Sequence, residues 1–133
     1  MSGGRKKILI VDDDADYMES ISCFLEARQF DVLKAHDGAQ ALKTAKMERP
    51  DLILMDVMMN ERTEGFFTVQ EIRHTEGMKD IPIFVISALY SRAPDFGIAP
   101  GGGWLAHDEF FSKPVDVNHL VEKIRQRIGG GPV

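Results

Sequence analysis

The sequence predicts an α/β protein in which helices cover both faces of a parallel β-sheet. Short continuous apolar runs, such as Ile8–Val11, Leu52–Met55 and Ile83–Ile86, are bounded by polar residues. This pattern is typical of strands that are buried on both sides, as they are in a parallel sheet. Segments with helical periodicity alternate with the runs, which favours right-handed strand–helix–strand crossovers. The 133 residues suffice for one domain with a sizeable core.

Three strands and two helices are predicted in the first half of the chain. The strands are expected at Lys7–Val11, Asp31–Ala35 and Leu52–Met55. The first helix, Ala15–Arg28, carries its apolar residues on one face, and Asp14 is a suitable N-cap. The second helix, about Ala39–Glu48, follows a turn at Asp37-Gly38 and is expected to end before Pro50.

The second half continues this alternation, with one irregular stretch. A third helix is expected at Phe67–Thr75, and the last two strands at Ile81–Ile86 and Phe110–Ser112. A final amphipathic helix begins after Asp116. A fourth helix is due between the last two strands, but prolines and Gly101-Gly102-Gly103 interrupt that stretch. Glycine costs about 1 kcal/mol and proline about 3 kcal/mol inside a helix, so an irregular or shortened helix is expected.

The composition narrows the classes of function. A net charge of −5 argues against nucleic acid as a direct ligand, because phosphate backbones attract basic surfaces. No run approaches the roughly 18 apolar residues that a membrane span requires. The single cysteine, Cys23, cannot form an internal disulfide, and its place in a helical pattern predicts a buried, inert thiol. We therefore expect a cytoplasmic protein that contacts neither nucleic acid nor membrane directly.

Polar residues suited to phosphate chemistry follow four of the predicted strands. They are Asp12 and Asp13 after the first strand, Asp56 after the third, Ser87 after the fourth and Lys113 after the fifth. In an open parallel sheet, ligands bind outside the carboxyl ends of the strands. Three carboxylates, a hydroxyl and an ammonium group are therefore expected to meet at one edge, which predicts an active site there.

Four motifs resemble the receiver domain of two-component response regulators. They are ILIVDDD at the first strand, DLILMDVMM at the third, IPIFVISA at the fourth and FFSKPVD at the fifth. Each motif alone is weakly specific, whereas the four in this order are highly specific. The resemblance covers residues 6–128 and leaves residues 129–133 as a flexible tail. It implies a doubly wound, flavodoxin-like parallel sheet of five strands in the order 2-1-3-4-5.

The resemblance also implies a function and roles for single residues. Asp56 matches the acceptor of a phosphoryl group, while Asp12 and Asp13 match the acidic pair. The family's hydroxyl, lysine and aromatic switch positions correspond to Ser87, Lys113 and Phe110. The implied partners are a sensor histidine kinase or histidine phosphotransfer protein and a downstream protein target. The implied function is a signalling switch and not an enzyme, with self-catalysed phosphoryl transfer and autodephosphorylation as its only chemistry.

The chemistry of this residue set agrees with that function. Mg²⁺ prefers oxygen ligands and keeps several waters, so one or two carboxylates suffice to bind it. Asp13 and Asp56 are the direct candidates, and Asp12 would hold a bound water. The backbone carbonyl of Met58 would complete the protein ligands. The ammonium of Lys113 and the nearby hydroxyl could contact phosphoryl oxygens, which supplies position and charge.

Two further expectations concern the neighbours of the acceptor. In the family, positions that correspond to Met58 and Leu89 tune the lifetime of the phosphoryl group. Both residues are apolar and cannot orient a hydrolytic water, so slow decay is expected. Phe110 has no hydroxyl to favour an outward pose, so its ring is expected to be largely buried before phosphorylation.

The chain departs from the family's pattern at a few positions. Asn60 stands where the family usually has proline, and Gly65 comes one residue late, which indicates an insertion after Asp56. The span from Ser87 to Lys113 is also longer than usual. These changes leave the site residues in place but affect the fourth-helix region and the surface to which it contributes.

Other functions stay open on the sequence alone. A flavodoxin-like cofactor-binding protein would need a phosphate-binding loop where this chain has Asp12–Asp14. A magnesium-dependent phosphatase with an aspartyl intermediate would usually need a second acid beside its nucleophile and a substrate-binding cap. A degenerate receiver would act as a phosphorylation-independent protein-interaction module, and it would usually lack the acceptor or the acidic pair. Structural roles also stay open on the sequence alone: the aspartates could form a helix cap, Asp56 could be a turn residue and Lys113 could be a surface lysine.

Overall fold

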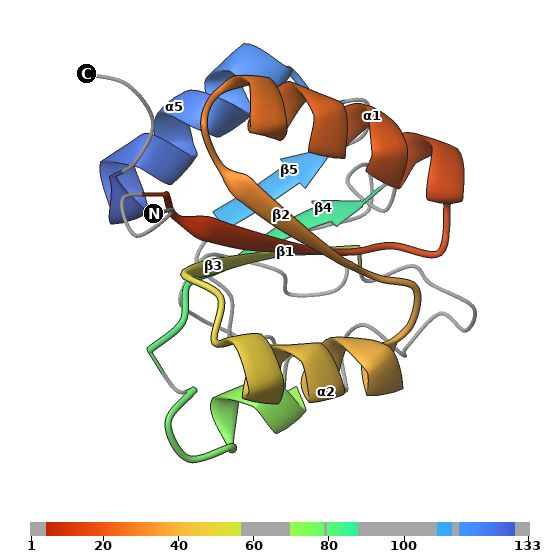
Figure 1. Cartoon of the computed structure of the whole chain (residues 1–133), viewed down its shortest axis with the longest axis vertical. Helices are drawn as coiled ribbons and strands as arrows, with labels where there is room; N and C mark the ends of the chain where they lie inside the picture. The colour runs from red at the N-terminus through yellow and green to blue at the C-terminus, as the bar shows by residue number, and fades with distance from the viewer. Residues whose placement is uncertain (1–4, 57–69, 79, 88–108, 113–114, 130–133) are drawn as a thin grey trace.

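The computed structural model in Figure 1 describes residues 5–56, 70–78, 80–87, 109–112 and 115–129, and only the backbone of Ser87, Phe110 and Ser112. The strands are β1 (Lys7–Val11), β2 (Asp31–Ala35), β3 (Leu52–Met55), β4 (Ile83–Ser87) and β5 (Glu109–Ser112). The helices are α1 (Ala15–Ala27), α2 (Gly38–Glu48) and α5 (Val117–Ile128). Residues 70–73 are also helical.

The five strands form one parallel sheet in the order β2-β1-β3-β4-β5, which confirms the predicted order. The register aligns the ends of the strands, because Val11 of β1 pairs with both Ala35 of β2 and Met55 of β3. Met55 in turn pairs with Val85 of β4. The carboxyl ends of β1 and β3 therefore lie at the same level, side by side in the centre of the sheet.

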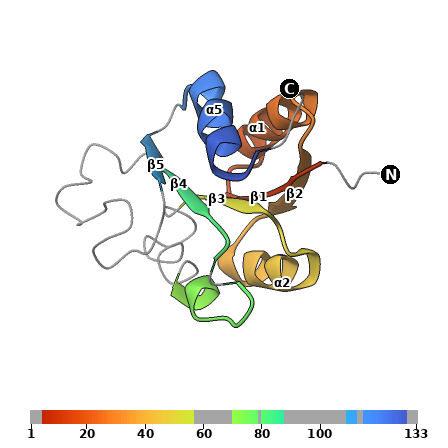
Figure 2. The ribbon, with the colours of Figure 1, turned by 90° about the vertical axis from the view of Figure 1, so that its left-hand side faces the viewer.

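Helices cover both faces of the sheet, as Figures 1 and 2 show. The helices α1 and α5 lie on one face, and α2 lies on the other with the short helical segment at residues 70–73. Side chains of β1 alternate between the two layers: Ile8 and Ile10 pack with α1 and α5, whereas Leu9 and Val11 pack with α2. This alternation explains why the runs of the central strands are continuously apolar, since both faces of β1 and β3 are buried.

Aspartate side chains begin all three long helices. Asp14 and Asp116 are the N-caps of α1 and α5, as predicted, and Asp37 caps α2. Because Asp37 takes the cap position, α2 begins at Gly38, one residue before the predicted start. Its last residue is Glu48, and Arg49 follows as a left-handed C-cap with φ 51°, immediately before Pro50, which would not extend a helix.

Two element boundaries differ from the prediction by two residues, whereas the end of α1, the end of β4 and the start of β5 each differ by one. Strand β4 begins at Ile83 and not at Ile81, because Ile81 donates its N–H to the carbonyl of Met78 in a turn. Pro82 has no N–H to donate to the sheet. The third helix was expected to continue to Thr75, but Thr75 donates to the carbonyl of Ile72 in a tighter turn. Its expected start, residues 67–69, lies outside the described residues, as does the expected fourth helix.

The predicted burial of Cys23 is wrong, because this side chain is exposed. The buried residues of α1 are Met18, Ile21, Ser22 and Leu25. With about 100° between successive residues of a helix, position 23 points roughly away from that face. None of the described helices is long and apolar enough to cross a membrane.

Candidate functional site

The two central strands carry Asp12 and Asp56 one residue beyond their ends. The backbone N–H of Asp56 donates to the carbonyl of Val11 (2.9 Å), and that of Asp12 donates to the carbonyl of Ala35 (3.1 Å). Hydrogen bonding between the strands therefore continues through both aspartates. Because β1 and β3 are neighbours in register, this backbone pairing holds the two residues side by side at the carboxyl edge of the sheet.

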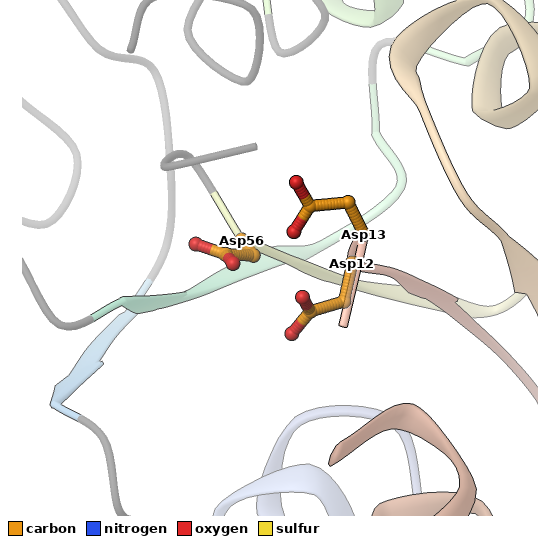
Figure 3. A group of neighbouring side chains, drawn as sticks. All are labelled: Asp12, Asp13 and Asp56. Carbon is orange, nitrogen blue, oxygen red and sulfur yellow. The ribbon is translucent and has the colours of Figure 1, made fainter. Parts of the chain in front are cut away.

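The carboxylates of Asp12, Asp13 and Asp56 form a cluster at this edge. One ligand oxygen from each residue can be chosen so that all three lie within 4.8 Å of one another. Figure 3 shows the three side chains extending in the same general direction from the ends of β1 and β3. Asp12 is only 3% exposed and Asp56 5%, whereas Asp13 is exposed. The cluster is therefore seated in the protein and is open to solvent beside Asp13.

A local turn orients the buried carboxylate of Asp12. Its Oδ1 accepts a hydrogen bond from the N–H of Asp14 at 2.9 Å. The side chain of Asp14 in turn accepts from the N–H of Tyr17 at 3.0 Å, as the cap of α1. The three successive aspartates thus have different roles: Asp14 caps α1, and Asp12 and Asp13 belong to the carboxylate cluster. The Asp12–Asp14 contact was not predicted, although an aspartate two residues before an N–H donor is a common turn signal.

The cluster fits a hard divalent cation. Oxygen ligands on opposite sides of an octahedral Mg²⁺ lie about 4.2 Å apart, since each metal–oxygen distance is about 2.1 Å. The three carboxylate oxygens span a similar distance, at most 4.8 Å. Two buried carboxylates at that separation also repel each other by about 3–4 kcal/mol at an effective dielectric constant near 20. A cation is therefore the chemical partner that this cluster favours.

The remaining predicted site residues are described only in part. The backbone of Ser87 ends β4 and pairs with Ser112 of β5, so it lies at the same edge of the sheet as the cluster. The side chains of Ser87 and Phe110 are not described, and Met58, Leu89 and Lys113 lie outside the described residues. Their roles remain predictions.

Comparison with known protein families identifies the family that carries this fold and this acidic cluster. The model of the response regulator receiver domain matches residues 8–125, which is most of the chain. The chain belongs to this family. Receiver domains are signalling modules of two-component systems and not classical enzymes. They bind Mg²⁺ at an acidic pocket, and they interact with histidine kinases or phosphotransfer proteins and with downstream targets.

Two curated relatives differ in how much of their length this domain accounts for. The DNA-binding dual master transcriptional regulator RpaA of Synechocystis sp. is 32% identical over 119 residues. That match covers 90% of this chain but only 47% of the relative, so the chain spans about half of that protein's length. The polar-differentiation response regulator DivK of Brucella anthropi is 27% identical, and the match covers 93% of this chain and 97% of the relative.

Solved structures support the fold. A sensor protein from Polaromonas sp. JS666 has a TM-score of 0.81 and 26% identity, with 93% of this chain and 96% of that chain covered. The receiver domain of sensor histidine kinase PA1611 from Pseudomonas aeruginosa PAO1 has a TM-score of 0.80 and 24% identity. That match covers 95% of this chain and 99% of the other, whose structure has a magnesium ion coordinated in the active site cleft.

Proposed function

We propose that this receiver domain is a phosphorylation-dependent switch that accepts a phosphoryl group on Asp56. The donor would be a phosphohistidine of a sensor histidine kinase or of a histidine phosphotransfer protein. The observation that supports this most is the cluster of Asp12, Asp13 and Asp56. A receiver that had lost phosphorylation would usually lack the acceptor or the acidic pair, and this chain has both.

The proposed reaction is a substitution at phosphorus. An oxygen of the Asp56 carboxylate attacks the phosphorus, an acyl phosphate bond forms, and the bond from phosphorus to the histidine nitrogen breaks. The position of Asp56 suits an acceptor, because its backbone is fixed by the bond to Val11 and its neighbours are carboxylates. Protein catalysis of phosphoryl transfer consists mainly of positioning and electrostatic stabilisation.

Charge is the main obstacle to this reaction, because an anionic nucleophile must approach an anionic phosphoryl group. Bound Mg²⁺ supplies positive charge that offsets both. The residues proposed to hold it are Asp13 and Asp56 directly, Asp12 through a water, and the backbone carbonyl of Met58. The exposed position of Asp13 would leave the ion accessible to a phosphodonor at the surface.

Two further side chains, those of Ser87 and Lys113, are proposed to assist. Ser87 would donate a hydrogen bond to a phosphoryl oxygen, and the ammonium of Lys113 would neutralise another. The backbone position of Ser87 at the carboxyl edge of β4 supports its role. Phe110 lies on the adjacent strand β5, where its backbone pairs with Val85. We propose that its ring responds to movement of Ser87 and so passes the signal to a downstream protein target. We propose that this takes place in the cytoplasm.

Mass spectrometry of the intact protein tests the proposal. After incubation with acetyl phosphate and Mg²⁺, we expect one added phosphoryl group. The same incubation with a chelator should give little product, and the Asp56→Asn variant should remain unmodified. Equal labelling of Asp56→Asn would contradict the assignment of the acceptor. A folded wild-type protein that is never labelled would instead favour a phosphorylation-independent interaction module.

A further inference from the structure

A second candidate site lies in a groove between the C-terminal end of α1 and the helix α5. These helices pack side by side over the same face of the sheet in Figures 1 and 2. The groove has a volume of about 550 Å³. Its lining comprises Arg28, Asn118, Val121, Glu122, Arg125 and Gln126. Arg28 is the C-cap of α1, whereas Asp14, next to the acidic cluster, is its N-cap. The groove is therefore distinct from the acidic cluster.

The guanidinium of Arg28 joins the two helices. It lies 4.4 Å from the centre of the Phe24 ring, a suitable distance for a cation–π contact. Its Nη2 also donates to the side-chain oxygen of Asn118 at 3.1 Å. These contacts hold the positive charge at the groove, yet they leave most of the five N–H donors of the guanidinium for a ligand or for water.

The guanidinium of Arg125 makes weaker hydrogen bonds than that of Arg28. Its Nη2 makes only a long contact, 3.5 Å, to the backbone carbonyl of Arg28. Its Nε is buried and has no hydrogen-bond partner among the described residues. Within the described part of the chain, neither Arg28 nor Arg125 has a carboxylate within 4.0 Å. Among the described residues, the two guanidinium groups therefore share a groove in which no carboxylate forms an ion pair with either, although Glu122 also lines it.

We propose that this groove binds an acidic segment of a partner protein. Carboxylates complement guanidinium groups well, because they can accept two parallel hydrogen bonds from one arginine. The amides of Asn118 and Gln126 can bond to the backbone of a bound peptide, and Val121 offers an apolar contact. These amide and apolar contacts favour a peptide over a polyphosphate such as nucleic acid, whose backbone has no amide groups to pair with them. This proposal does not depend on phosphorylation of Asp56.

An NMR titration with a defined probe tests the proposal. The protein is the folded Asp56→Asn variant, and the probe is a short peptide of alternating glutamate and leucine. We expect the peptide to shift the backbone amides of Asn118 and Gln126 and the Nε–H signal of Arg125. A matched glutamine–leucine peptide and inorganic phosphate, at equal ionic strength, should not reproduce these shifts. The proposal is overturned if the shifts are absent, fall elsewhere, or are equally produced by phosphate.

Charge-removing substitutions provide an independent test, because some should weaken binding of the acidic peptide and others should strengthen it. Arg125→Gln should weaken binding of the acidic peptide roughly tenfold, the effect of about one charge-assisted hydrogen bond. Glu122→Gln should strengthen binding, because it removes the acid that lines the groove. The control is Arg127→Gln, which makes the same charge change on α5 outside the lining residues. If Arg125→Gln unfolds, Arg28→Gln takes its place. Equal weakening by the control would show a net-charge effect and overturn the proposal.

Discussion

At the scale of single residues, the acidic cluster combines burial with mutual repulsion. Asp12 and Asp56 are almost fully buried, and their oxygens lie within 4.8 Å of each other and of an oxygen of Asp13. Backbone hydrogen bonds and the turn at Asp14 maintain this arrangement against the repulsion. A native state with concentrated negative charge is stabilised by any cation that binds it in preference to the unfolded chain.

We therefore expect divalent cations to stabilise the folded protein specifically. Mg²⁺ should raise the melting temperature of the wild-type protein, whereas Na⁺ at matched ionic strength should not. Asp13→Asn should remove most of the increase, because it deletes one proposed ligand at the exposed side of the cluster. The measurement is thermal unfolding followed by circular dichroism, with Asp16→Asn as a control for net charge. A full Mg²⁺ effect in Asp13→Asn would place the ion elsewhere.

Cys23 belongs to a surface cluster that keeps its thiol protonated. Its Sγ donates to Glu19 at 3.6 Å, and Glu19 also pairs with Lys34 at 2.7 Å. Desolvation and the hydrogen bond to Glu19 raise the pKa of the Cys23 thiol. The hydrogen bond from Lys34 lowers the pKa of Glu19, so this carboxylate remains charged to lower pH.

Alkylation rates test the state of this thiol. A raised pKa leaves less thiolate at pH 8, so iodoacetamide should react with Cys23 more slowly than with an unperturbed thiol. Glu19→Gln should lower the pKa and speed alkylation a few-fold, since tenfold corresponds to about one pKa unit. The control is Asp16→Asn, which removes an exposed carboxylate from the first turn of the same helix. An unchanged rate in Glu19→Gln, or an equal acceleration in the control, would contradict this explanation.

At the scale of elements, the helix starts are set by aspartate caps. The carboxylate of Asp116 accepts hydrogen bonds from two N–H groups at the start of α5, at 3.0 Å from Asn118 and 3.3 Å from His119. These N–H groups have no partner within the helix, so the cap satisfies donors that would otherwise depend on water. The negative charge also complements the positive end of the helix dipole.

Removal of this cap should have a measurable cost. Asp116→Ala should lower the free energy of unfolding by about 1 kcal/mol, the usual effect of losing an N-cap. Asp116→Asn should retain most of the stability, because the side-chain oxygen still accepts the same bonds. Urea denaturation of the two variants distinguishes them. An equal loss in both would indicate that charge, and not the hydrogen bonds, is the stabilising factor.

Some strand bounds can be predicted from neighbouring residues in the sequence, whereas others depend on turns that the apolar pattern does not show. The bounds of β1, β2 and β3 were predicted correctly. The apolar runs of β1 and β3 end abruptly at aspartates, whereas β2 is delimited by the end of α1 and the turn at Asp37-Gly38. The start of β4 was missed because the turn bond from Ile81 to Met78 and the missing N–H of Pro82 outweigh the apolar pattern. Cys23 is exposed, although cysteine is usually buried, because its phase in α1 places it opposite the buried face of the helix.

The site could be predicted only as far as strand position determines it. Asp12 and Asp56 follow strands that are neighbours in the sheet, so their meeting follows from the predicted topology. Their spacing could not be predicted, because it depends on the pairing of Val11 with Met55, residues far apart in the chain. The Arg28–Arg125 groove was not predicted, since it depends on how α1 and α5 pack. The roles of Ser87 and Lys113 remain predictions.

At the scale of the whole molecule, the sheet separates two apolar layers that depend on the same central strand. Ile53 of β3 is fully buried in the layer covered by α2, and Leu54 is 1% exposed in the layer covered by α1 and α5. Both layers include side chains of β3, so loss of this strand would disrupt both of them. The two layers should therefore unfold together in one cooperative transition.

Truncations on either side of β3 test this cooperativity. Ile53→Ala and Leu54→Ala should each lower the free energy of unfolding by about 2–5 kcal/mol, from lost burial and an unfilled cavity. Both variants should keep a single transition when probed by circular dichroism and by fluorescence. Met47→Ala, at a position 69% exposed, should change stability by less than about 0.5 kcal/mol. Two separate transitions in either core variant would contradict a common core.

The proposed role of Asp56 as phosphoacceptor is tested most directly by locating the phosphoryl group on the chain. The protein is labelled with acetyl phosphate in the presence of Mg²⁺, reduced with borohydride and digested, and the peptides are sequenced by tandem mass spectrometry. Reduction converts an aspartyl phosphate into homoserine, so the modified position is read directly. We expect homoserine at position 56 and nowhere else in the chain. Homoserine at Asp12 or Asp13, with Asp56 intact, would contradict the claim that Asp56 is the phosphoacceptor.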